Sequence, residues 1–304
     1  MTVDRVTESF RSSLGGILLN IRDGTIAAPI AVFTFLSVSS IFVGATGFFQ
    51  TFIGYILLGG PPSLPMCIAA FLITFSTYSL NKLTDMAEDS INMPERVKFI
   101  RDRRQLILLT SLGAYLLSIP LAFSVTPKAL PILFVPLLAN LLYSSRLLPG
   151  IPRMKDIPVM KNVFVATSWA MVCTLLPSVD ISNVPRMTAL AVLYFMFVKV
   201  FINTILYDIR DVDGDRASGV KTIPVLLGTK KTTMIQLAIN STILFILALL
   251  NNHAKLLVMG MMLYGYIFII YFRHRQNPLL LDAFEDGEWM IFSAVYSLVF
   301  RFFC

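Results

Sequence analysis

The chain has 304 residues, of which 56% are hydrophobic and only 14% are charged, and its mean hydropathy is +0.75. A soluble domain carries roughly 25% charged residues, so this composition excludes an ordinary soluble protein and predicts a polytopic membrane protein. The formal net charge of +7 does not indicate nucleic-acid binding, because basic residues in such a chain set its membrane topology.

The first 25 residues mix charged and apolar side chains, which is typical of an amphipathic helix at the membrane interface. Apolar runs long enough to cross ~30 Å of hydrocarbon follow along the rest of the chain. The sequence therefore predicts an all-α membrane protein with nine spanning helices, at about 26–48, 64–83, 106–124, 128–145, 160–178, 187–207, 233–251, 255–272 and 288–303.

Most of the 25 Lys and Arg residues fall in loops on one side of these expected spans. The positive-inside rule places that side, together with the N-terminus, in the cytoplasm. Most of the acidic residues fall on the same side. We therefore expect an integral protein of the plasma membrane whose polar site faces the cytoplasm.

A ladder of polar residues ends the second expected span. Asn81, Asp85 and Asp89 are four residues apart, so on a helix they stack on one face at intervals of ~6 Å. Carboxylates crowded beside a hydrocarbon span are costly unless a cation lies between them, and oxygen ligands suit Mg²⁺. We expect this face to bind a magnesium-bound diphosphate, with Asn81 on the metal or on a phosphate oxygen.

The sixth expected span ends in a second ladder of the same kind. Asn203, Tyr207, Asp211 and Asp215 recur every four residues, and Asp208 lies three residues before Asp211. Two ladders on one membrane side are expected to face each other and to hold two Mg²⁺ ions that bridge the diphosphate. The expected metal ligands are Asp85, Asp89, Asp208, Asp211 and Asp215.

Basic side chains near the same mouth would bind the diphosphate directly, although loop Lys and Arg also serve topology alone. Tyr207 and Tyr143, which ends the fourth expected span, would offer a ring face or a hydroxyl to a cationic intermediate. Lys199 lies deeper on the second ladder and is expected to face the cavity, with its role left open. The basic candidates are Arg22, Arg96, Arg146, Lys155, Lys161 and Lys221.

These motifs resemble those of a known family. The NxxxDxxxD pattern of the second span, a tyrosine-containing loop after the fourth, and YDxxDxxGD after the sixth resemble the UbiA superfamily of intramembrane prenyltransferases, archaeal members most of all. The resemblance implies a single domain over 1–304, with four-helix halves at about 26–145 and 160–272 and a ninth helix at about 288–303. It further implies a central cavity that opens to the cytoplasm and to lipid.

The resemblance implies Mg²⁺-dependent transfer of a prenyl group from an isoprenyl diphosphate, with Asp85, Asp89, Asp208, Asp211 and Tyr143 as catalytic residues. An aromatic quinone precursor is the first expected acceptor, and a glycerol-phosphate ether lipid is the alternative. Two other classes remain open. A CDP-alcohol phosphotransferase has a DxxDG pattern, but in Asp211-Val212-Asp213-Gly214 only one residue separates the two Asp residues. A cation transporter would place its acidic residues near the bilayer midplane, whereas here they cluster at one end of the spans.

Overall fold

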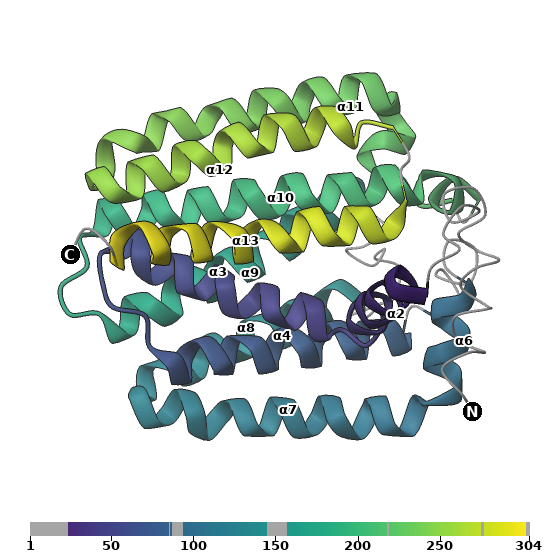
Figure 1. Ribbon diagram of the computed structural model, residues 1–304, viewed down its shortest axis with the longest axis horizontal. Helices are drawn as coiled ribbons and strands as arrows, with labels where there is room; N and C mark the ends of the chain where they lie inside the picture. Colours follow the sequence, from purple (N-terminus) through teal and green to yellow (C-terminus); the bar gives the residue numbers. More distant parts are fainter. Residues whose placement is uncertain are drawn as a thin grey trace.

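The computed structural model describes residues 24–84, 86, 94–144, 157–217, 219–274 and 277–301. Within these ranges every regular element is a helix, and the long helices run side by side along one direction (Figure 1). The predicted all-α class is therefore confirmed.

The helices follow one another in a simple order. The first part of the chain forms α2 (Gly24–Val38), α3 (Ile41–Leu58), α4 (Leu64–Thr84), α6 (Pro94–Asp102), α7 (Arg104–Val125), the short 3-10 helix η1 (Pro127–Ala129) and α8 (Leu130–Ser144). The second part forms α9 (Met160–Asp180), α10 (Arg186–Ala217), α11 (Ile223–Ser241), its 3-10 continuation η3 (Thr242–Leu249), α12 (Asn252–Tyr271) and α13 (Pro278–Arg301).

The first expected span, at 26–48, is wrong in its bounds. The chain turns between α2 and α3, where Ser40 adopts a left-handed backbone conformation with φ 66°. Serine is a weak helix former because its hydroxyl competes for backbone hydrogen bonds. The membrane-crossing apolar helix is α3, and α2 is a separate helix before it (Figure 1).

The last expected span also differs from the structure. Helix α13 begins at Pro278, ten residues before the expected start at 288, and so takes Asp282, Glu285, Asp286 and Glu288 into its first half. Seven described helices are long and apolar enough to cross a membrane, namely α3, α4, α7, α9, α10, α11 with η3, and α12. Helix α8 is shorter and α13 is not among the seven, so the count of nine spans stays a prediction.

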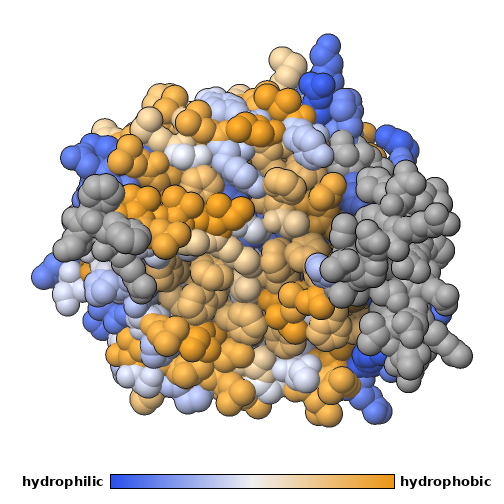
Figure 2. Space-filling model, viewed as in Figure 1, coloured by the Kyte–Doolittle hydropathy of each residue, from blue (hydrophilic) through white to orange (hydrophobic). Residues whose placement is uncertain are grey.

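The long helix α10 lies at the centre of the bundle. It packs against α9, α11, α3 and α13, and it buries a continuous apolar face that includes Phe195, Ile202 and Leu206. In contrast, α7 exposes Leu109, Leu116 and Leu117. Hydrophobic residues cover most of the face in Figure 2, with hydrophilic residues toward its two ends, as expected of a surface that lipid covers.

Helices α3 and α9 approach each other closely at Gly54. A Cβ atom at this position would lie 2.1 Å from the backbone oxygen of Cys173 in α9. Only glycine permits this approach, which packs α3 directly against α9. Both helices contribute to the polar cavity described below.

Candidate active site

A cavity of about 290 Å³ lies between α3, α4, α9, α10 and α13. Its walls carry polar residues from both expected ladders, because α4 and α10 both line it. The sequence-predicted residues that line it are Asn81, Arg96, Lys161, Tyr207, Asp208 and Asp211. The structure therefore gathers these six in one place, while their roles remain predictions.

Other predicted site residues lie elsewhere. Lys221 is exposed and does not line the cavity, so the structure does not bring it to the expected diphosphate site. Asp215 lies one turn beyond Asp211 on α10, outside the lining. The side chain of Tyr143, at the end of α8, and five other candidates lie outside the described residues. Those five are Arg22, Asp85, Asp89, Arg146 and Lys155.

Asp208 is held between α9 and α10. One carboxylate oxygen accepts from the Lys161 Nζ at 3.1 Å, and the other accepts from the Asn162 Nδ2 at 2.7 Å. Asn162 also donates to the Thr204 hydroxyl at 3.1 Å. Both α9 donors lie in the first turn of that helix, whose N-terminal dipole also favours a negative charge. Asn162 is a site residue that the sequence analysis missed, although it directly follows Lys161.

Asp211 is bound by its neighbour Arg210. The guanidinium donates to both carboxylate oxygens, and its carbon also lies 4.7 Å from the centre of the Tyr207 ring. A further guanidinium nitrogen is 3.7 Å from Asp282 of α13. Arg210 thus connects the second ladder to α13, a role that no sequence motif indicated.

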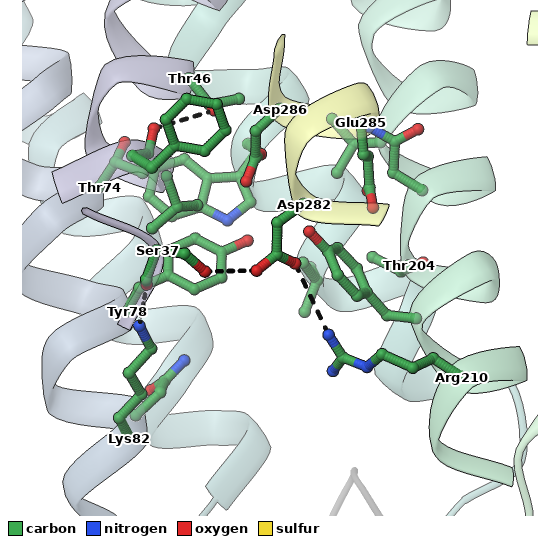
Figure 3. Close-up of a pocket in the computed structure, with 18 of the residues that line it drawn as sticks. Ser37, Thr46, Thr74, Tyr78, Lys82, Thr204, Arg210, Asp282, Glu285 and Asp286 are labelled. Atoms are coloured by element: carbon green, nitrogen blue, oxygen red, sulfur yellow. Dashed lines mark hydrogen bonds and ion pairs between the residues drawn. The ribbon is translucent and has the colours of Figure 1, made fainter. Parts of the chain in front are cut away.

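Three acidic residues of α13 form an unexpected part of the cavity wall. Asp282, Glu285 and Asp286 all line it, because α13 begins ten residues earlier than expected. Figure 3 shows Asp282 between Ser37 and Arg210, and Asp286 on the side of Thr46. Asp282 and Asp286 are four residues apart, the same spacing that marked the two ladders, so this signal was present in the sequence.

Helix α2 closes one side of the cavity mouth. The Lys82 Nζ donates to the backbone oxygens of Ser37 and Val38, each at 3.0 Å, near the C-terminal end of α2 where the helix dipole is negative. The Ser37 hydroxyl donates to Asp282 (Figure 3). These contacts join α2, α4 and α13 around the opening.

The donor atoms fit Mg²⁺. The Asn81 Oδ1 and an Asp215 carboxylate oxygen are buried and accept no hydrogen bond from the described residues. Uncharged amide and charged carboxylate oxygens are the ligands that Mg²⁺ prefers. Within the described chain no group of three or more His, Cys, Asp or Glu residues is already arranged around one point. A metal site would therefore draw ligands from both ladders.

Lys199 does not line the cavity, contrary to expectation. Its Nζ lies 2.6 Å from the Glu288 Oε1 and donates to the backbone oxygen of Met261 at 3.3 Å. Lys199 and Glu288 are almost completely buried, so this ion pair connects α10, α12 and α13 below the cavity.

Comparison with known proteins places the chain in a family. The model of the UbiA prenyltransferase family matches residues 31–283. Digeranylgeranylglyceryl phosphate synthase of Methanoculleus marisnigri is 31% identical over 189 residues, which are 59% of this chain and 63% of that protein. The Thermococcus gammatolerans enzyme of the same name is 29% identical over 186 residues, again 59% of this chain and 63% of that protein. The matched region thus spans less than two thirds of these relatives.

Two solved structures have the same fold. A UbiA homologue from Archaeoglobus fulgidus bound to GPP and Mg²⁺ superposes with a TM-score of 0.66 at 16% identity, over 87% of this chain and 98% of that one. An apo UbiA homologue from Aeropyrum pernix gives 0.66 at 15% identity, over 86% and 98%. With its apolar spanning helices, the chain is an integral membrane protein. The family model covers most of its length, and the chain belongs to the UbiA prenyltransferase family.

Proposed function

We propose that the protein is a Mg²⁺-dependent intramembrane prenyltransferase that transfers a prenyl group from an isoprenyl diphosphate to the hydroxyl of a glycerol-phosphate ether lipid. The observation that carries this proposal is that Asn81, Asp208 and Asp211 line one cavity together with Arg96 and Lys161. The relatives named digeranylgeranylglyceryl phosphate synthase favour this acceptor over the aromatic quinone precursor that was expected first.

The donor would bind with its diphosphate at the cavity mouth. Lys161 and Arg96 supply positive charge for the phosphate oxygens. Asp208 and Asp211, with Asp215 and with Asp85 and Asp89 of the first ladder, would hold Mg²⁺. When bound, the metal neutralises the charge that develops on the leaving diphosphate.

The wall below the mouth suits an allylic cation. Tyr78 and Trp169 stack with ring centroids 5.7 Å apart, and both line the cavity together with Tyr207. Aromatic faces attract a positive charge and exclude water, which would otherwise capture the cation. The bond between the prenyl carbon and the diphosphate oxygen breaks, and the acceptor oxygen bonds to that carbon.

We further propose that the cavity opens toward the cytoplasm and that the protein resides in the plasma membrane. In the sequence, basic residues are concentrated in the loops expected on this side of the membrane, and Arg96 of α6 lines the cavity. The prenyl tail would extend between helices toward lipid.

The test is transfer by the purified protein from geranyl, farnesyl and geranylgeranyl diphosphate. Acceptors would be geranylgeranylglyceryl phosphate, hydroxybenzoate and dihydroxynaphthoate, each with Mg²⁺ or with EDTA. We expect Mg²⁺-dependent product with the glycerol-phosphate acceptor. Product with an aromatic acceptor alone would overturn the acceptor assignment.

Other results would point to the two remaining classes. Failure to bind any prenyl diphosphate would overturn the whole proposal. In that case, nucleotide release from a CDP-alcohol would indicate a phosphotransferase, and cation flux into proteoliposomes would indicate a transporter.

A further inference from the structure

Four acidic side chains of α13 face α10 or the cavity at successive depths. Asp282 is at the mouth, 3.7 Å from Arg210, and Glu288 lies below the cavity, 2.6 Å from Lys199. Glu285 lies halfway between them, about 4.5 Å along the helix axis from each. Glu285 and Asp286 therefore lie between these two ion pairs, and both line the cavity.

Asp282 and Glu288 each form an ion pair with a cation, whereas Glu285 and Asp286, which lie between them, form none within the described part of the chain. Glu285 is 2% exposed and Asp286 is 8% exposed. Among the described residues no cation forms an ion pair with either, and one Glu285 carboxylate oxygen accepts no hydrogen bond there. The Tyr207 hydroxyl hydrogen-bonds to Glu285, and the Thr46 hydroxyl to Asp286. A buried carboxylate that lacks a cation and keeps one oxygen unsatisfied is still costly, so it needs a further ligand or a proton.

Three of the four cations that line the cavity are engaged with other groups. Lys82 donates to the end of α2, Lys161 pairs with Asp208, and Arg210 binds Asp211 through both carboxylate oxygens. No ready-made metal cluster exists among the described acids. The ligand that suits Glu285 is therefore a hydroxyl group, which donates one hydrogen bond and carries a removable proton.

The depth of Glu285 matches the place of the reaction. In the proposed function the diphosphate binds at Asp208 and Asp211 at the mouth, so the prenyl carbon bonded to it would lie just below these residues. Glu285 is about one helical turn below Asp282, which shares Arg210 with Asp211. The family model ends at residue 283, so Glu285 lies beyond the part of the chain that the family match covers.

We propose that Glu285 is the general base of the transfer reaction. The acceptor hydroxyl donates a hydrogen bond to the Glu285 carboxylate. As the acceptor oxygen bonds to the prenyl carbon and the carbon–diphosphate bond breaks, the hydroxyl proton passes to Glu285 and the electron pair leaves with the diphosphate. This inference rests on the proposed function, because it assigns a residue to the acceptor side of that reaction.

The test compares Glu285→Gln with the wild type, using Asp102→Asn on the exposed surface of α6 as a control with the same change of charge. Loss of a general base lowers turnover by about 100-fold or more. We expect that loss in prenyl transfer for Glu285→Gln. Binding of geranylgeranyl diphosphate with Mg²⁺, slow diphosphate release without acceptor, and the unfolding temperature should remain as in the wild type. Glu285→Asp should retain part of the activity.

Two results would overturn the assignment. One is transfer by Glu285→Gln within about threefold of the wild type, because loss of a general base should cost about 100-fold or more. The other is a parallel loss of donor binding or folding, which would indicate a structural role. Failure of the proposed function can be told apart from these results, because the wild type itself would then show no prenyl transfer. That result would overturn both the proposed function and the role of Glu285.

Discussion

The Arg210 guanidinium binds both carboxylate oxygens of Asp211, at 2.8 Å from Nε to Oδ1 and 2.7 Å from Nη2 to Oδ2. A bidentate guanidinium occupies one lone pair on each oxygen, on the side where a metal ion would bind both oxygens together. Asp282 lies 3.7 Å from the same guanidinium and is a second acceptor for it. Arg210 would therefore compete with a metal ion bound at Asp211.

Replacement of Arg210 by Met should lower the Mg²⁺ concentration that half-saturates donor binding. Hydrogen bonds to charged groups contribute about 1.5–3 kcal/mol, and the metal would no longer have to displace them, so we expect a shift of about fivefold or more. A Mg²⁺ titration of geranylgeranyl diphosphate binding measures the shift. An increased Mg²⁺ requirement would show instead that Arg210 holds the diphosphate.

Asp282→Asn is the reciprocal variant. It removes the alternative anionic partner of Arg210, so the guanidinium should stay on Asp211 and the Mg²⁺ requirement should rise in the same titration. An unchanged requirement would show that Asp282 takes no part in releasing Asp211.

Asp211→Ala should abolish turnover in a protein that still folds. Removal of one preorganised electrostatic group from an active site costs about 100-fold or more in rate, and Asp85→Ala in the first ladder should behave alike. The control is Asp213→Ala on the same helix, because Asp213 is exposed and pairs with Arg216 at 3.8 Å. Near wild-type transfer by either ladder variant, measured with product chromatography, would contradict the metal assignment.

Lys199→Met should destabilise the protein through the buried Glu288 that it leaves unpaired. Removal of one partner from a buried ion pair costs about 3–5 kcal/mol. The double variant Lys199→Met with Glu288→Leu should recover much of this loss, because no buried charge remains. Thermal unfolding in detergent would measure both. Equal unfolding temperatures for the wild type and the single variant would show that the pair contributes little.

Gly54→Ala should destabilise the packing of α3 on α9, because its methyl group would meet the Cys173 backbone oxygen at 2.1 Å. Overpacking of this kind costs about 1–3 kcal/mol. Gly113→Ala on α7 is the matched control, since no atom lies within 4 Å of its added methyl group. A shift of the unfolding temperature in Gly113→Ala as large as in Gly54→Ala would show that the close approach is not the cause.

The sequence predicted the parts of the site that repeat within one helix. Asn81 on α4, and Tyr207, Asp208 and Asp211 on α10, share a cavity because a four-residue spacing keeps side chains on one helix face. Hydropathy found the apolar helices, but it missed the turn at Ser40 because the residues on both sides of it are equally apolar.

Contacts between helices that are distant in the chain could not be predicted from the sequence. The acids of α13 look like a charged loop before an apolar run, and only their burial against α10 shows that the helix starts at Pro278. Likewise, local spacing cannot show that Lys199 pairs with Glu288 or that Asn162 holds Asp208. The sequence by itself determined the apolar helices, the two ladders and the family resemblance, because each depends on periodicity within one segment. Only the tertiary structure decided which polar groups meet, because partners far apart in the chain are chosen by packing.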